Sequence, residues 1–195
     1  MNVRSTRPRV ERASQRREQL LELALRMFGE EGWEGTTIRN LATRAGVSLG
    51  LLYHYFRNKE ELLVAVMDHY SMLPELRAII ERHRDRPASE VLLDMCYEIH
   101  QRIRERREVC WILFREARQH AEVDQRMRGI RDEGTRLLAD YLQARVEAGE
   151  LRPHNSSVLA RALMSVMFLR VLVDEPADGF LPDLVDCYLR GLLAR

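Results

Sequence analysis

Residues 37–56, with the sequence TIRNLATRAGVSLGLLYHYF, decide the fold class of this chain. Thr37 and Ser48 each stand before a periodic apolar segment, where a hydroxyl caps the first turn of a helix. Gly46 lies between the two segments and can adopt the left-handed conformation that ends a helix. The first segment carries apolar residues at the spacing of one helical face, namely Ile38, Leu41, Ala42 and Ala45. The stretch therefore predicts a helix-turn-helix.

The packing of these two helices follows from residue size. Ala42 is small where the helices cross, and Gly46 follows four residues later. The inward positions are apolar or aromatic: Leu41, Ala45, Val47, Leu52 and Tyr55. An ordinary helical hairpin within a bundle is the alternative. Two caps and a turn glycine at these fixed offsets favour the helix-turn-helix.

Helical periodicity continues through the rest of the chain, and no alternating β-branched run occurs, so we predict an all-α protein. Residues 1–13 are expected to form a disordered basic arm, followed by a helix over about 14–31. A fourth helix opens at Asn58 with a capping box formed by Glu61. Pro74 and Pro87 mark a connecting segment. Further helices are predicted over about 89–106, 109–120, 123–148, 155–173 and 183–193.

Composition excludes several classes of protein. With 195 residues, 46% of them hydrophobic and 31% charged, the chain can bury one good core or two small ones and is neither disordered nor collagen-like. The longest apolar stretch, 162–169, is far shorter than the roughly 20 residues of a membrane span. No secretory signal is predicted, and three separated cysteines without a C-x-x-C pair fit reduced thiols. We expect a cytoplasmic protein that does not contact a membrane.

Residues 32–63, GWEGTTIRNLATRAGVSLGLLYHYFRNKEELL, resemble the DNA-binding domain of the tetracycline-repressor (TetR) family of bacterial transcriptional regulators. The specific match covers roughly residues 14–66, and beyond it only chain length and helical character agree. The resemblance implies an N-terminal three-helix DNA-binding domain at 14–58 and a C-terminal helical ligand-binding and dimerisation domain at 59–195. It also implies a homodimer that binds double-stranded DNA at a near-palindromic operator and is released by a small-molecule effector.

The resemblance and the residue types together select the candidate DNA-binding residues. Hydroxyls and free N–H groups at helix N-termini meet phosphate oxygens. If Tyr55 turns inward, Tyr53 and His54 are left to reach the DNA backbone. Lys59 matches the family's phosphate-binding lysine, and a solvated surface charge is its alternative. The candidates are Thr37, Arg39, Ser48, Leu49, Gly50, Leu51, Tyr53, His54, Tyr55 and Lys59.

Base reading is expected to be divided between the two helices. Leu49 and Leu51 offer no hydrogen bond and can touch only thymine methyl groups, whereas Gly50 lets the backbone approach closely. Hydrogen-bonded specificity then falls to Arg39, which could reach O6 and N7 of a guanine. A phosphate contact is the alternative for Arg39.

Positive charge is concentrated at the start of the chain. Residues 1–60 hold 11 basic and 7 acidic groups, whereas the remainder holds 20 basic and 23 acidic groups. Basic residues that lead into a DNA-binding domain release counterions when they reach the duplex. We therefore expect operator affinity to fall with added salt.

The larger domain carries two further predicted sites. The resemblance places an effector pocket at Met95, Tyr97, His100, Trp111, Phe114, Met164, Met167 and Phe168, with plain core packing as the alternative. It places a dimer interface at Leu159, Leu163, Val166, Leu184, Val185, Tyr188 and Leu192, with closure of a monomeric bundle as the alternative. Arg115 and Arg118 are candidates for holding an anionic group, although a surface position suits them better.

Catalytic and metal chemistry find little support in the sequence. No G-x-S-x-G, H-E-x-x-H, Walker or dinucleotide-binding pattern occurs, so we predict neither an enzyme nor a cofactor. Cys96 and His100 have the spacing of a zinc or copper ligand pair, but no second pair completes a site, so no metal is predicted. A constitutive or architectural DNA-binding protein and a helical protein-interaction module remain as alternative functions.

Overall fold

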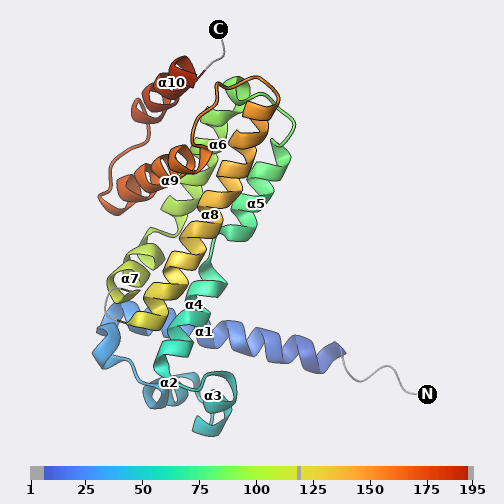
Figure 1. The fold of residues 1–195 in the computed structure, drawn as a ribbon. Helices are drawn as coiled ribbons and strands as arrows, with labels where there is room; N and C mark the ends of the chain where they lie inside the picture. The colour runs from blue at the N-terminus through green and yellow to red at the C-terminus, as the bar shows by residue number, and fades with distance from the viewer. Residues whose placement is uncertain (1–6, 118–119, 193–195) are drawn as a thin grey trace, which may run out of the picture. The chain divides into compact units, whose positions relative to one another are not determined.

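The computed structural model describes residues 7–117 and 120–192, with the backbone alone described at 7–10, 116–117 and 192. Within these ranges the chain forms ten helices and no strand, which confirms the predicted all-α class (Figure 1). The chain divides into two compact units. The first unit contains residues 1–70 and 111–127, and the second contains 71–110 and 128–195.

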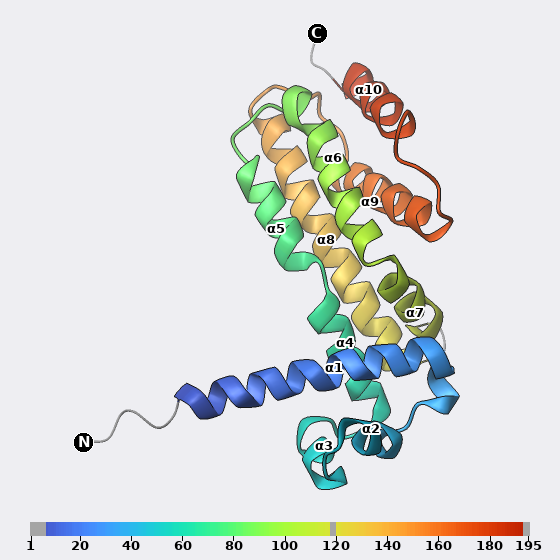
Figure 2. The same ribbon diagram turned by 180° about the vertical axis from the view of Figure 1, so that it is seen from behind.

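The first unit is built on α1 (Arg7–Gly35), α2 (Ile38–Ala45), α3 (Leu49–Tyr55) and α4 (Lys59–Tyr70). Helix α1 packs against α4 and α2, and α2 packs against α3 (Figure 2). Their shared core contains fully buried side chains, among them Leu21, Met27, Phe28, Leu41, Leu52, Phe56, Leu62 and Leu63. These helices form the three-helix arrangement that the sequence predicts, with a fourth helix added to it.

Helix α1 and the domain boundary differ from the prediction. The helix begins at Arg7 rather than at residue 14, because Pro8 lies in the first turn, where its missing N–H costs no hydrogen bond. Gly32 bends the helix with a φ of 68° instead of ending it, and the helix extends to Gly35. The boundary after residue 58 is also wrong, since α4 packs on α1 and residues 111–127 join the same unit.

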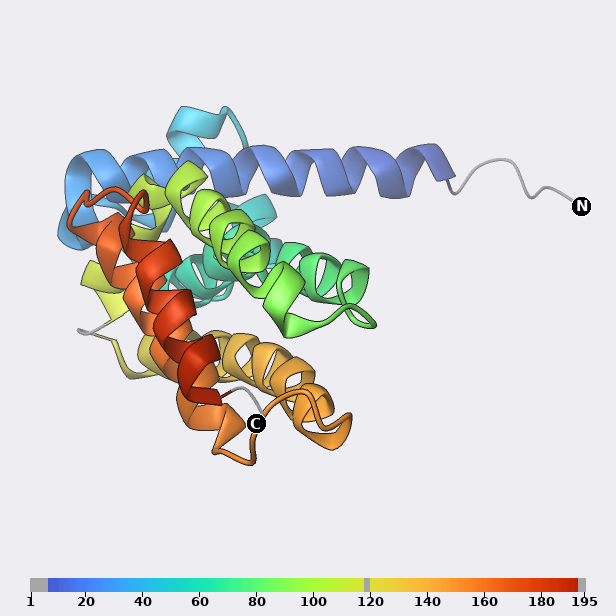
Figure 3. The same ribbon diagram turned by 90° about the horizontal axis from the view of Figure 1, so that it is seen from above.

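The second unit contains α5 (Leu73–Arg82), α6 (Ala88–Glu105), α9 (Ser156–Leu172) and α10 (Phe180–Leu192). Helix α6 is central, since α5, α9 and α10, the last two orange and red in Figure 3, all pack on it. Parts of α7 (Arg107–Ala117) and α8 (Ala121–Glu147) complete the unit. Its core is aliphatic and sulfur-rich, with buried Leu76, Leu92, Met95, Ile99, Leu138, Leu142, Leu163 and Met167.

The segment predicted as a connection between Pro74 and Pro87 contains helix α5. Pro74 does not prevent this helix because it lies in the first turn. Leu76, Ile79 and Ile80 form the buried face of α5. The proline pair therefore marks the start of α5 and the start of α6, rather than a region without structure.

Two glycines in the helix-turn-helix should respond to alanine in opposite directions. Gly46 has a φ of 65°, so Gly46→Ala should destabilise the protein by about 1–2 kcal/mol. Gly50 is helical, so Gly50→Ala should stabilise it by about 0.5–1 kcal/mol. An added methyl group meets nothing within 4 Å at either position, so only the backbone conformation differs. Denaturation followed by circular dichroism measures both changes, and shifts of the same sign would contradict this account.

Candidate nucleic-acid interface

The helix-turn-helix is fixed by local hydrogen bonds at both caps and at the turn. The Thr37 hydroxyl accepts a hydrogen bond from the Asn40 N–H (3.0 Å), and the Ser48 hydroxyl accepts one from the Leu51 N–H (3.2 Å). At the turn, Gly46 N–H donates to the carbonyl of Thr43 at 3.2 Å. Both caps and the left-handed glycine therefore occur where the sequence predicts them.

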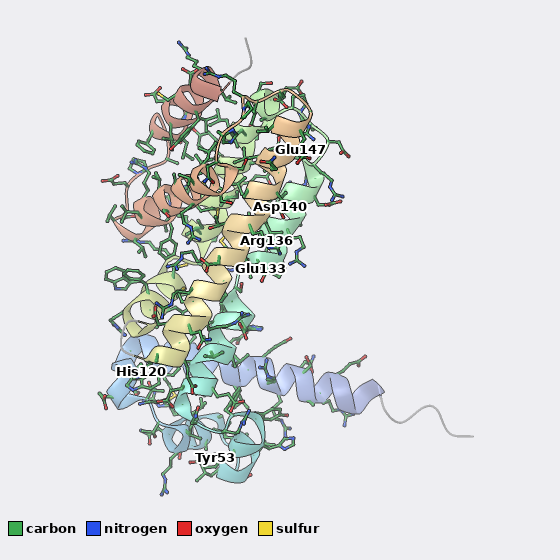
Figure 4. All side chains as sticks on the ribbon, in the orientation of Figure 1. Tyr53, His120, Glu133, Arg136, Asp140 and Glu147 are labelled. Carbon is green, nitrogen blue, oxygen red and sulfur yellow. The ribbon has the colours of Figure 1, made fainter. Side chains whose placement is uncertain are left out.

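Helix α3 presents one buried face and one exposed face. Leu52 is fully buried, Phe56 at the C-cap of the helix is 1% exposed, and Tyr55 is half-buried. On the other side Gly50 and His54 are exposed, and Tyr53 projects with 52% of its surface accessible (Figure 4). The exposed face thus combines a backbone without a side chain at Gly50 with two aromatic groups that carry polar atoms.

The two leucines of α3 do not share this exposed face equally. Leu49 is half-buried at the start of the helix. Leu51 lines a groove between α1 and the α2–α3 turn, together with Arg16 and Ser48. Leu51 is half-buried and lies two residues after Leu49, so the two side chains point to nearly opposite sides of α3, with Leu51 on the side of α1.

Arg39 and Arg44 differ in whether their charge is already paired. Arg44 forms ion pairs with Glu30 and Glu31 at the end of α1. Arg39 is exposed on α2 and forms no ion pair within the described part of the chain. Its guanidinium is therefore free to bind an acceptor outside the protein.

Lys59 lies at the first position of α4 and contacts Trp33, a residue that the sequence analysis did not select. Its Nζ donates a hydrogen bond of 2.7 Å to the Trp33 carbonyl and lies 4.2 Å from the centre of the indole ring. Trp33 is 8% exposed. An ammonium has three N–H donors, so this bond leaves two for another acceptor. The feature of the sequence that could have identified Trp33 is its position as an aromatic residue directly after Gly32.

The start of α4 is fixed by reciprocal hydrogen bonds close to the predicted capping box. The Asn58 side-chain oxygen accepts from the Glu61 N–H at 2.7 Å. The Glu61 carboxylate accepts from the N–H of Arg57, one residue before the cap, at 2.7 Å. These bonds hold the helix end that carries Lys59.

Helix α1 adds positive charge beside this surface. Arg12, Arg16 and Arg26 are exposed, and none forms an ion pair with any residue that the structure describes. Arg17 lies over the ring of Phe56, 5.8 Å from its centre. The unpaired guanidinium groups suit an anionic partner. The prediction for residues 1–6 of the basic arm lies outside the described residues.

The predicted effector-pocket residues divide between the two units. Met95, His100 and Met167 are buried in the second unit, and Tyr97, Met164 and Phe168 pack half-buried near them. Trp111 and Phe114 are 51% and 37% exposed on α7, in the part of the chain that belongs to the first unit. Both side chains therefore lie on the surface of α7 and not in the core of this unit. The Arg115 guanidinium donates to the Phe28 carbonyl at 3.2 Å, and Arg118 lies outside the described residues.

His100 and Cys96 are buried side by side on α6. Burial lowers the pKa of His100, assisted by the charges of Arg104 and Arg170, and its Nε2 has no hydrogen-bond partner within the described chain. Burial raises the pKa of Cys96 to about 12. No group of three His, Cys, Asp or Glu side chains within residues 7–117 and 120–192 is arranged to hold a metal ion.

The predicted dimer residues lie mostly inside the subunit. Leu159, Leu163 and Val185 are buried in the core of the second unit, which corrects their assignment to an interface. Val166, Leu184 and Tyr188 are half-buried, and the Leu192 side chain lies outside the described residues. The exposed apolar residues on and directly after α9 are instead Val158, Leu169 and Val173, at 63%, 58% and 55%. Amphipathic spacing could not separate the two faces because α9 is apolar on both.

Comparison with known proteins finds one family model for the N-terminal region and another for the C-terminal region. Residues 20–66 match the family model of bacterial regulatory proteins of the tetR family, and residues 85–168 match that of the tetracyclin repressor-like C-terminal domain. The chain belongs to the TetR family. Within residues 7–117 and 120–192, no helix has the length and apolar character needed to span a membrane.

Individual relatives agree with this membership. The HTH-type transcriptional regulator BetI of Burkholderia thailandensis is 45% identical over 69 residues, 35% of this chain and 34% of BetI. The matched region thus spans about a third of that relative. A TetR-family regulator from Mesorhizobium loti has a TM-score of 0.75, with 14% identity and 94% and 99% of the two chains covered. The structure of the ketosteroid transcriptional regulator KstR2 of Mycobacterium tuberculosis has a TM-score of 0.61 and 26% identity. The match covers 92% of this chain and 97% of that chain.

Proposed function

We propose that this TetR-family chain regulates transcription, most simply as a repressor, by binding a near-palindromic operator as a homodimer that a small-molecule effector releases. The observation that carries the proposal is the exposed face of α3, with Gly50, Tyr53 and His54 held between a hydroxyl cap and Lys59. Operator DNA lies in the bacterial cytoplasm, so this function places the chain there. No catalytic residue is assigned.

Base recognition in this proposal uses both helices of the motif. The bare backbone at Gly50 allows α3 to approach the base edges in the major groove closely. Tyr53 and His54 flank it with polar atoms that reach phosphates or bases. Arg39 supplies a fork of N–H donors for O6 and N7 of a guanine.

The DNA backbone is bound by groups that carry no sequence information. Thr37 and Ser48 use their hydroxyl oxygens to cap their helices, and their hydroxyl hydrogens and the N-terminal N–H groups remain as donors to phosphate. Lys59 contributes its remaining N–H donors. The unpaired arginines of α1 add a salt-dependent attraction.

Arg39 and Lys59 should affect DNA binding in different ways. Arg39→Ala should relax the preference at one base pair of each half-site, since it removes a group that binds a base. Lys59→Ala should weaken specific and random DNA alike and reduce the slope of log affinity against log salt by about 0.9 for each phosphate that is no longer neutralised. Titrations on both DNAs at several salt concentrations measure these effects.

Arg136→Ala is the matched control, because Arg136 is exposed on α8 (Figure 4) and forms an ion pair of 3.4 Å with Asp140, one turn away. Arg136→Ala should leave the affinity for both DNAs and the slope of log affinity against log salt unchanged. If Arg39→Ala and Lys59→Ala each reduced the affinity equally on specific and on random DNA, Arg39 would not read a base and the separate roles of the two residues would be refuted. A wild-type affinity that does not change with salt would overturn DNA binding itself.

Gly50→Ala should weaken operator binding while it stabilises the fold. The added methyl group meets no protein atom within 4 Å, so any loss of affinity must arise at the DNA. Gly191→Ala is the control, since Gly191 is also helical and exposed with open space around it. Gly191→Ala should stabilise α10 without changing affinity. Unchanged operator affinity for Gly50→Ala would show that α3 does not lie close to the bases.

Dimer formation is proposed through the outer face of α9. This helix buries Leu159, Leu163 and Met167 within its own subunit. Val158 and Leu169 on the helix and Val173 at its end remain exposed. A helix that is apolar all round needs a second partner. A second copy of α9 supplies an identical apolar face, and two copies match the two halves of a palindrome.

Leu169→Glu should convert the dimer into monomers, because each interface would bury two carboxylates without partners. Operator affinity should then fall together with the mass measured by light scattering. Gln101→Glu adds the same charge at an exposed position of α6 and should leave the dimer intact. A dimeric Leu169→Glu protein would place the interface elsewhere.

The effector site is proposed in the second unit, between α6 and α9. Methionine and aromatic side chains from these helices belong to one core cluster, and α6 also carries the buried His100, whose Nε2 lacks a partner among the described residues. These groups suit a small apolar or amphipathic molecule with one polar atom. Effector candidates that raise the melting temperature should also lower operator affinity, because a ligand shifts the equilibrium only as far as it prefers the state that does not bind DNA. Stabilisation without loss of DNA binding would count against release by such a ligand.

A further inference from the structure

The indole of Trp33 contacts two side chains that come from distant parts of the chain. Lys59 donates a hydrogen bond of 2.7 Å to the Trp33 carbonyl, and its Nζ lies 4.2 Å from the indole centre. The His120 ring lies with its centre 3.7 Å from the same indole, tilted by 33°. Phe28 stacks on Trp33 at 5.9 Å. Trp33 is 8% exposed, so these neighbours leave its indole little freedom.

His120 belongs to residues 111–127, which pack on both α1 and α4 within the first unit. Arg115 donates to the Phe28 carbonyl near the end of α1, and Arg126 donates to the Asp68 carboxylate on α4. At Gly29 an added methyl group would lie 3.0 Å from the Ile112 side chain, so α1 and α7 approach each other closely there. His120 is therefore carried by a segment that is anchored on either side of it.

The interaction that the structure describes for the His120 ring is its contact with Trp33. Its Nε2 is buried and has no hydrogen-bond partner within the described residues. A buried nitrogen without a partner costs free energy, so polar contacts at that atom do not explain the position of the ring. The ring contacts the indole with 3.7 Å between the two ring centres, directly before the start of α8 (Figure 4).

We propose that Trp33 is a positioning residue for the phosphate-binding group of Lys59, and that His120 holds Trp33 in place. A lysine ammonium sits on a flexible four-carbon stem, so restricting it before binding lowers the entropy lost at the DNA. The Trp33 carbonyl and ring restrict it and leave two N–H donors for a phosphate. This inference rests on the proposed function, because Lys59 must meet DNA.

The consequence is that residues 111–127 can act on DNA affinity through the His120 ring. A displacement of His120 removes support from Trp33, and the ammonium of Lys59 then samples more positions. Phosphate binding weakens without any change in α3, which reads the bases. DNA affinity and sequence preference can therefore change independently.

Lys59 is the only lysine in the chain, so its position can be observed directly. Protein labelled with 13C-lysine gives the side-chain signals of one residue. In the wild type the Hε protons should be shifted upfield by the indole ring current. Trp33→Leu should return them to the ordinary value, and Trp33→Phe should keep part of the shift. An unshifted Hε signal in the folded wild type would overturn the contact between Lys59 and the indole.

The effect on DNA is tested with Trp33→Leu, Lys59→Gln and the double variant, each as the full chain. Lys59→Gln should reduce the salt slope by about 1.8 for a dimer in which each subunit neutralises one phosphate fewer. Trp33→Leu should reduce it in the same direction by a smaller amount and should have no further effect when Lys59 is already Gln. Additive reductions of affinity, with the slope unchanged by Trp33→Leu, would show a merely structural role and overturn the proposal. Trp33→Phe should restore most of the affinity.

His120 is tested in the same way. His120→Ala should weaken DNA binding only while Lys59 is present, and His120→Phe, which keeps a ring against the indole, should bind nearly as tightly as the wild type. His69→Ala is the control, because His69 is exposed and its ring contacts Tyr70 at 4.9 Å, away from Trp33. Equal reductions of affinity for His120→Ala in both backgrounds would remove His120 from the proposal.

Failure of this inference differs from failure of the proposed function. If the wild type binds operator DNA with a steep salt dependence and Lys59→Gln has no effect, Lys59 does not meet phosphate and the inference falls alone. If the wild type shows no salt-dependent affinity for any DNA, the proposed function falls as well. Circular dichroism of each variant identifies effects that come from unfolding. If Trp33→Leu or His120→Ala unfolds, the affinities of the conservative variants Trp33→Phe and His120→Phe test the proposal, which expects both to bind nearly as tightly as the wild type.

Discussion

Everything at the candidate DNA surface depends on the burial of one face of α3. A helix of seven residues does not persist alone in water, because too few hydrogen bonds follow its costly first turn. Leu52 and Phe56 supply the missing stability by entering the core that α1, α2 and α4 share. Gly50, Tyr53 and His54 can remain exposed only because those two side chains are buried. Local caps define the ends of the helix, and tertiary packing keeps it folded.

The second unit meets a related constraint with a different result. Helix α9 buries one apolar face in its own subunit, while Val158, Leu169 and the following Val173 stay exposed. Exposed apolar surfaces of this kind are unfavourable in water and mark protein interfaces. The homodimer proposed here resolves this, and it also supplies the two-fold symmetry that a palindromic operator needs. In this proposal the same apolar surface connects stability to DNA recognition.

Trp33, Lys59 and His120 connect the N-terminal helices to a segment far along the chain. Residues 111–127 lie between stretches that belong to the second unit, yet they pack with α1 and α4. The chain therefore passes from one unit to the other at several points. An event that displaces residues 111–127 can reach the DNA-binding surface through direct contacts, of which the stack of His120 on Trp33 is one.

Local chemistry made the helix-turn-helix predictable from the sequence alone. Hydroxyl caps at Thr37 and Ser48 and the left-handed Gly46 act within a few residues, so their effects can be read without knowledge of distant contacts. The boundaries of α1 and the existence of α5 were harder, because Pro8, Gly32 and Pro74 permit more than one outcome. Proline in a first turn is compatible with a helix, and a glycine can bend one without ending it.

Only the tertiary structure decided which apolar residues face the core. Leu159, Leu163 and Val185 match an interface as well as a core by their spacing, and burial assigns them to the core. Leu51 turns toward α1, Trp111 and Phe114 are exposed, and Lys59 meets Trp33 across 26 positions in the chain. The sequence by itself determined the helical class of the chain and the caps of the helix-turn-helix, since those depend on neighbouring residues. The pairing of faces depends on contacts between distant residues, which periodicity does not encode.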